Sequence, residues 1–130
     1  IGRPLKVSKE EVLALMTALE LFASGGYDAD WDRQHTLLAS IATQLADQPV
    51  TCTIEGTREA ERSPLLSIEI DEAGVGRSAF DICRGLRDGS PAVYVSHGRL
   101  AAATLTINPL CLDDTQAPEL ARRIREELAG

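Results

Sequence analysis

The chain has 130 residues, of which 44% are hydrophobic and 25% charged, and its formal net charge is −7 at pH 7. These proportions are those of one globular domain, 1–130, large enough to bury a core of its own. The acidic balance argues against a nucleic-acid or anionic-membrane partner, because such surfaces gather Lys and Arg. No apolar run approaches the roughly 20 residues that span a bilayer, and nothing resembles a signal peptide, so we expect a cytoplasmic protein.

Two helices are expected first. Ser8 and Glu11 have the spacing of a capping box, in which each side chain bonds the backbone amide of the other residue. The first helix runs to about residue 23 and ends in 24–26, and the second starts at Asp28 or Asp30 and ends before Pro49. An apolar stripe on each helix predicts that both pack on each other and on a sheet. The stripes are Val12, Leu15, Met16, Leu19 and Phe22, and then Trp31, Leu38, Ile41, Ala42 and Leu45.

Strands and one helix follow. Segments 50–55 and 65–71 alternate apolar and polar residues, as strands do. Ser78 can cap a third helix, which Asp88-Gly89 ends and which carries Phe80, Ile82, Cys83 and Leu86. Segments 92–96 and 99–107 predict a second hairpin around His97-Gly98.

The last helix has one apolar stripe, formed by Leu120, Ile124 and Leu128. Its charged residues are expected to lie mostly in water and to neutralise one another: Arg122, Arg123, Arg125, Glu126 and Glu127. Two helices followed by the order ββαββα predict an α+β fold. We expect a sheet of about four antiparallel or mixed strands with helices packed on one face.

The cysteines do not indicate a site. Cys52, Cys83 and Cys111 are odd in number, widely spaced and never in a C-x-x-C pair. This spacing argues against a disulfide framework and against zinc, and favours buried free thiols.

The start of the chain carries a motif. Its first residues read IGRPLKVSKEE, which resembles the IGR-x-x-K-V-x-K-E-E pattern in a group of fold-type-I pyridoxal-phosphate (PLP) enzymes, where it introduces the small C-terminal domain. This group comprises the selenocysteine synthase (L-seryl-tRNA(Sec) selenium transferase) and D-glucosaminate-6-phosphate ammonia-lyase-like proteins. The matching residues are Arg3, Lys6, Val7, Lys9, Glu10 and Glu11, while Ser8 stands where the family commonly has glycine. Segments 90–95 and 107–110, with the Arg-rich last helix, resemble more loosely the close of the same domain.

The resemblance implies the C-terminal domain of a lyase or transferase that acts on an amino acid or an amino sugar acid. The chain begins without Met, and we expect a large N-terminal domain to precede it and to hold PLP through a lysine. Lys6 and Lys9 are the only lysines of the sequence, and both lie where the family has no cofactor-binding lysine. The resemblance therefore implies that this chain alone is catalytically silent, and that it belongs to a homo-oligomer. We also expect an exposed apolar strip on the first helix, where the large domain would lean.

Three basic residues are candidate substrate contacts. The resemblance places Arg3 and Lys6 near the mouth of the active site, where a guanidinium and an ammonium can bind a carboxylate or phosphate. Arg3 can equally well hydrogen-bond the large domain, and a solvated Lys6 is the favoured alternative. Arg99 could face a substrate carboxylate, as arginines do in other small domains of this fold type.

The remaining polar residues favour structural roles. His97 lies in a tight turn, and His35 has no second metal ligand at a suitable spacing. Asp113 and Asp114 are expected to begin a helix rather than to bind a metal. We expect no catalytic or metal-binding residue in this chain.

A second function stays open. The chain could be a freestanding module with a ferredoxin-like sheet, built for small-molecule binding or dimerisation, in which Arg3 and Arg99 have no catalytic role. The coding sequence before Ile1 separates the two hypotheses. One or two further domains with a lysine in a Gly-rich context support the enzyme, whereas an immediate start codon supports the module.

Overall fold

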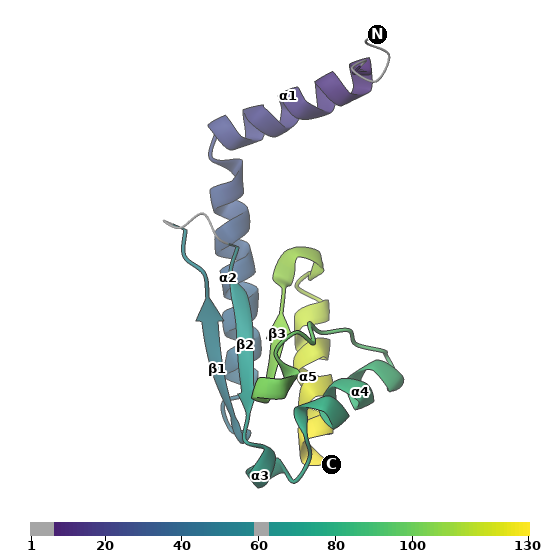
Figure 1. Cartoon of the computed structure of the whole chain (residues 1–130). Coiled ribbons are helices and arrows are strands. Elements are labelled where there is room, and N and C mark those ends of the chain that lie inside the picture. Colours follow the sequence, from purple (N-terminus) through teal and green to yellow (C-terminus); the bar gives the residue numbers. More distant parts are fainter. Residues whose placement is uncertain (1–6, 59–62) are drawn as a thin grey trace.

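The computed structural model describes residues 7–58 and 63–130, with Tyr27 described by its backbone alone. The fold is α+β, as predicted, and consists of a body built on one antiparallel sheet and a helix that projects from it (Figure 1). The projecting helix is α1 (Lys9–Ala23), and α2 (Gly26–Gln44) connects it to the body. No described helix combines the length and the apolarity needed to cross a bilayer.

The capping box at the start of α1 is confirmed. The Ser8 amide donates to Glu11 Oε2 at 2.7 Å, and the Glu11 amide donates to Ser8 Oγ at 3.2 Å. The helix ends at Ala23 as predicted, and Gly25 adopts a left-handed conformation with φ of 72°. A residue without a side chain takes that conformation at little cost, so the chain turns sharply here and α2 begins at Gly26, two residues before Asp28.

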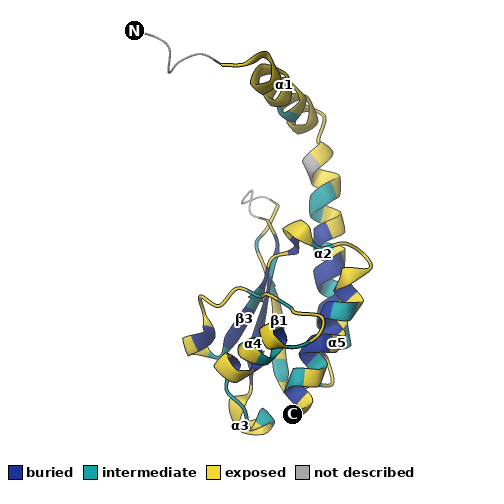
Figure 2. Cartoon of the chain, turned by 90° about the vertical axis from the view of Figure 1, so that its right-hand side faces the viewer, coloured by how far each residue is buried: buried dark blue, intermediate teal, exposed yellow. Residues whose placement is uncertain are grey.

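The sheet has the strand order β1-β2-β3, with β1 (Val50–Glu55), β2 (Leu65–Ile70) and β3 (Thr104–Ile107) all antiparallel. Its register pairs Cys52 with Ile68 and Ile68 with Leu105. Side chains alternate between the two faces of a strand, so these residues share one apolar face. The helix α2 packs against this face beside α5 (Gln116–Ala129), and the core lies between them (Figure 2).

The described sheet has three strands where about four were expected. Of the expected strand 92–96, Ser96 alone bridges to the sheet, and its amide donates to the Thr106 carbonyl at 3.0 Å. The Val93 amide instead donates to the Leu86 carbonyl at the end of a helix. A short 3-10 helix, η2 (Leu100–Ala102), then occupies the expected start of the next strand, so β3 begins at Thr104 rather than at 99.

Three short helices complete the body: α3 (Glu72–Val75), α4 (Ala79–Asp88) and the 3-10 helix η3 (Pro109–Cys111). One of them, α4, packs against α5 and β3. The cap of α4 is confirmed, because Ser78 Oγ accepts a hydrogen bond from the Asp81 amide at 3.1 Å. Ile82 is fully buried in this helix, whereas Phe80 is 54% exposed.

The prediction that α1 packs on the sheet is wrong. None of its residues is buried, because the helix extends away from the body and meets α2 near their junction (Figure 2). The expected buried thiols also need correction, since Cys111 is exposed and Cys52 and Cys83 are half-buried.

Arg123 is buried, against the expectation that it lies in water. Its guanidinium donates to Glu126 Oε2 at 2.8 Å, to Glu127 Oε1 at 3.1 Å and to the Gly85 carbonyl at 3.2 Å. It therefore fastens α5 to α4. Gly89 lies so close to this guanidinium that an added Cβ would overlap it.

Candidate functional site

The three candidate substrate contacts fall in different places. Arg3 and Lys6 lie outside the described residues. Arg99 Nη1 donates to Glu55 Oε1 at 2.7 Å and to Ser67 Oγ at 3.0 Å. Ser67 Oγ in turn donates to Glu55 Oε1 at 2.6 Å, which completes a polar triad.

The triad lies on the face of the sheet opposite the core, because Ser67 alternates with Leu66 and Ile68. The Ser67 hydrogen bond and then Arg99 lower the pKa of Glu55 below its usual value. Arg99 is thus already paired with a carboxylate of its own chain. A substrate anion would have to displace Glu55, and the role of Arg99 in binding stays a prediction.

Other singled-out residues have structural partners. His35 stacks on Trp31 with ring centroids 5.1 Å apart. Asp113 Oδ1 accepts from the amides of Thr115 and Gln116, both at 2.8 Å, just before α5. Among residues 7–58 and 63–130, no three His, Cys, Asp or Glu side chains lie together as metal ligands would.

The largest concentration of exposed apolar side chains is on α1. We call it the α1 apolar surface, and its members are each 47–69% exposed: Val12, Leu13, Leu15, Met16, Leu19, Leu21 and Phe22. With 3.6 residues per turn, Leu13 and Leu21 lie on other sides of the helix than the stripe through Leu15 and Leu19. A helix that is apolar on several sides is ordinarily buried, so this surface indicates an interface with another protein element.

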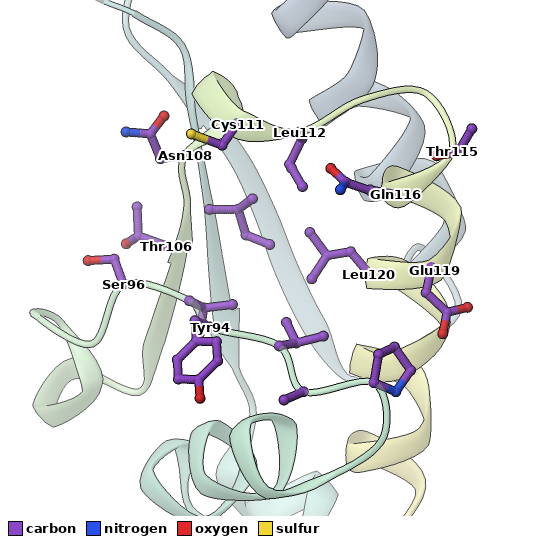
Figure 3. A pocket seen from close by; sticks show the side chains of 15 residues that line it. Tyr94, Ser96, Thr106, Asn108, Cys111, Leu112, Thr115, Gln116, Glu119 and Leu120 are labelled. Atoms are coloured by element: carbon purple, nitrogen blue, oxygen red, sulfur yellow. The ribbon is translucent and has the colours of Figure 1, made fainter.

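A pocket of about 530 Å³ opens on the body, at the free edge of β3 (Figure 3). We call it the edge pocket. Segment 91–96 lies on one side of it, the start of α5 on the other, and η3 at its end. Its apolar lining includes Val93, Val95, Ile107, Leu112 and Leu120, and its polar lining includes Tyr94, Ser96, Thr106, Asn108, Cys111 and Gln116.

The charge of the edge pocket is low. None of its fifteen lining residues is Lys or Arg. The carboxylate of Glu119 is engaged by Arg122, whose Nε donates to Oε2 at 2.9 Å and whose Nη2 donates to Oε1 at 2.6 Å. This pairing holds the pKa of Glu119 below its ordinary value. The pocket therefore combines an apolar lining with neutral hydrogen-bonding groups.

The sequence did not predict the edge pocket. A complete hairpin of 92–96 with 99–107 would have closed the free edge of β3, and the pocket exists because those segments diverge beyond the Ser96 bridge. The alternation of apolar residues in 92–96 did not reveal this divergence.

Comparison with known proteins relates nearly the whole chain to part of longer ones. No family model matches. The chain is 26% identical over 129 residues to the 5'-C-glycyluridine monooxygenase-decarboxylase of Streptomyces sp., and the match covers 98% of this chain and 32% of that protein.

The fold is similar to that of part of a solved enzyme. The structure of D-glucosaminate-6-phosphate ammonia-lyase superposes with a TM-score of 0.69 at 20% identity, over 98% of this chain and 34% of that chain. The chain thus spans about a third of the length of either protein.

Proposed function

We propose that the chain is a domain of a PLP-dependent lyase or transferase that acts on an amino acid or an amino sugar acid. One observation carries this proposal: almost the whole chain matches about one third of a longer enzyme. This holds for one enzyme in sequence and for another in fold. The name of the sequence relative contains a glycyl group, and the name of the structural relative contains a glucosaminate. The two enzymes are named for different reactions, but both names indicate a substrate that carries an amine and a carboxyl carbon.

PLP, when bound, withdraws electrons from a substrate carbon next to an amine. The described residues of this chain do not fit the cofactor. Covalent binding of PLP requires a lysine whose amine is held in position by its surroundings. Lys9 is instead exposed in the first turn of α1, at the end of that helix far from the body. The cofactor therefore belongs to the proposed large domain, and no chemical step is assigned to the described residues.

The proposed contribution of this chain to binding is a set of cations. Arg3 follows Gly2, whose lack of a side chain lets the backbone approach a ligand closely. A guanidinium at that position can hold a carboxylate or phosphate through two parallel hydrogen bonds. Lys6 adds a second positive charge, and Arg99 can contribute where a substrate anion replaces Glu55.

The α1 apolar surface supports the proposed partnership with a large domain. A helix without a buried residue gains little from the body of its own chain, so its stability depends on what covers it. We propose that the large domain covers one side of α1, and that a homo-oligomer contact covers another.

The test uses the longer protein that contains this chain. Arg3→Ala should raise the Michaelis constant or lower turnover by more than about tenfold, because losing a buried charged contact typically costs about 2–5 kcal/mol. The absorbance of bound PLP and the melting temperature should stay unchanged. Lys9→Ala, an exposed cation on the same segment, is the matched control and should leave the kinetics intact.

Two results would contradict the proposal. An Arg3→Ala enzyme that melts earlier but keeps its kinetics would make Arg3 a residue of the domain junction. A coding sequence that starts immediately before Ile1 would favour the freestanding binding or dimerisation module. The body supports that second candidate, because the buried core is formed without any residue of α1.

A further inference from the structure

We propose that the free edge of β1 pairs with the same edge of a second copy of this chain, so that two sheets join into one. β1 ends the strand order β1-β2-β3, and in Figure 1 no described element flanks its outer side. This inference goes beyond the proposed function, because strand pairing at β1 requires neither PLP nor a large domain nor the α1 apolar surface. Its failure would leave the proposed enzyme untouched.

The direction of the backbone groups of β1 follows from a hydrogen bond at its start. The Asp71 amide donates to the Pro49 carbonyl at 3.0 Å, so Pro49 faces the side of β2. Backbone groups alternate between the two sides of an antiparallel strand, and Cys52 and Ile54 therefore direct their N–H and carbonyl groups away from β2. Among the described residues, neither takes part in a backbone hydrogen bond outside the sheet. Donors and acceptors are thus available at the edge.

The side chains of β1 do not protect this edge. Natural edge strands are commonly guarded by lysines, prolines or bulges. Segment 50–54 reads VTCTI, without a charged residue or a proline, and its register with β2 is uninterrupted. Glu55, the charged residue at its end, is paired with Arg99. The net charge of −7 opposes association of two copies, but this edge adds little to that repulsion.

Two copies of β1 can pair in an antiparallel register centred on Cys52. A two-fold axis normal to the sheet places Cys52 opposite its counterpart, and the two residues can exchange two backbone hydrogen bonds. Val50 then lies opposite Ile54 of the second copy. The Ile54 amide can donate to the Val50 carbonyl, while the Val50 amide already donates to the Gln48 carbonyl at 2.7 Å. The edge is therefore complementary to itself.

The side chains that meet in this register are compatible. With the axis normal to the sheet, both apolar layers lie on one side of the joined sheet. Val50 and Ile54, which are half-buried at the border of the core, would cover one another there. On the opposite face, Thr51 would meet Thr53, and such pairs stabilise antiparallel strands. Glu55 lies beyond the paired segment, so the two glutamates stay at opposite ends of the contact.

Amide exchange at the edge tests the proposal on the 130-residue chain. NMR would measure the exchange of backbone amides with water in dilute and in concentrated solution. The amides of Cys52 and Ile54 should exchange at least about threefold more slowly in concentrated solution, because only the monomer exposes them. The amides of Thr51 and Thr53 bond β2 in either state, so their exchange should be slow at both concentrations.

Charged variants test the contact itself. Thr51→Lys with Thr53→Lys places ammonium groups of the two copies opposite one another, on side chains that are exposed in the monomer, and should abolish the concentration dependence. Thr36→Lys with Thr43→Lys adds the same charge at exposed positions of α2 and should preserve it. Thermal unfolding of each variant verifies that it is folded. Concentration dependence that survives Thr51→Lys with Thr53→Lys would overturn the proposal.

A further variant separates this contact from α1. Leu15→Glu with Leu19→Glu should keep the slow exchange of Cys52 and Ile54 in concentrated solution, because neither leucine lies near β1. Loss of the effect in this variant would assign the protection to α1. Exchange that is independent of concentration in the unmodified chain would exclude pairing with a second copy, and protection in the longer protein alone would assign the edge to a strand of another domain.

Discussion

At the scale of single residues, Arg123 shows how a charge becomes part of the core. Its side chain is 6% exposed, compared with 47% for Arg122 beside it. Burial of a guanidinium is costly unless its donors are satisfied, and here two carboxylates and two carbonyl oxygens surround it. The same residue type at adjacent positions therefore performs different tasks.

This contrast yields a prediction. Arg123→Ala should lower the free energy of unfolding by about 2–4 kcal/mol, because it leaves the half-buried Glu127 with Arg77 as its remaining ion-pair partner and removes a link between α5 and α4. Arg122→Ala, which removes exposed pairs on a single helix, should have a small effect. Urea unfolding followed by circular dichroism measures both. Equal losses in the two variants would show that burial of Arg123 carries no special weight.

Side chains that act over short sequence distances were the most predictable. Ser8 with Glu11, and Ser78, cap their helices as expected, because a cap depends on residues three apart. The partner of Arg99 was not predictable, since Glu55 lies 44 positions away and only the strand pairing brings them together. The burial of Arg123 was missed for a similar reason, because α4 covers the flank of its helix.

At the scale of elements, α1 combines a correct pattern with a wrong environment. Periodicity showed which residues share a face, and the helix has the predicted end at Ala23. It could not show what covers that face, because this depends on a neighbour and not on the helix. Segment 92–96 failed similarly: its alternation fits a strand, but a strand also needs a partner along its length.

The exposed side chains of α1 lead to a second prediction. The isolated chain should self-associate at high concentration, and Leu15→Glu with Leu19→Glu should weaken that association by at least about tenfold, given about 1.5–3 kcal/mol for each buried leucine. Thr17→Glu adds a charge to the same helix outside the stripe and should have a smaller effect. Sedimentation equilibrium provides the measurement. A wild-type chain that stays monomeric at high concentration would contradict an interface on α1.

At the scale of the whole molecule, stability resides in the body. The buried apolar residues run in sequence from Leu37 on α2 to Leu128 on α5. They fill the space between these helices and one face of the sheet, and the other face of the sheet lies outside the core. The sequence predicted the α+β class and the bounds of β1, because the core positions follow regular periods. It did not predict the three-stranded sheet or the edge pocket, since both depend on where two segments separate.

A truncation tests this division. A chain that begins at Ser24 should unfold cooperatively, with a melting temperature within about 3 °C of that of the whole chain, because none of the described residues it loses, 7–23, is buried. Differential scanning calorimetry of both chains provides the comparison. A large fall in melting temperature would show that α1 supports the body through contacts that its exposure does not reveal.

The left-handed turn at Gly25 has a geometric consequence for any larger assembly. The 19 residues of α2 make a rod about 28 Å long, and it leads from this turn into the body. If α1 is fixed on another domain, a rotation of about 20° at the turn would swing the far end of that rod by about 10 Å. The backbone conformation of Gly25 would thus set the distance between the edge pocket and the domain that holds α1. A residue with a side chain at this position would narrow the range of that rotation and would leave the contacts of the core unchanged.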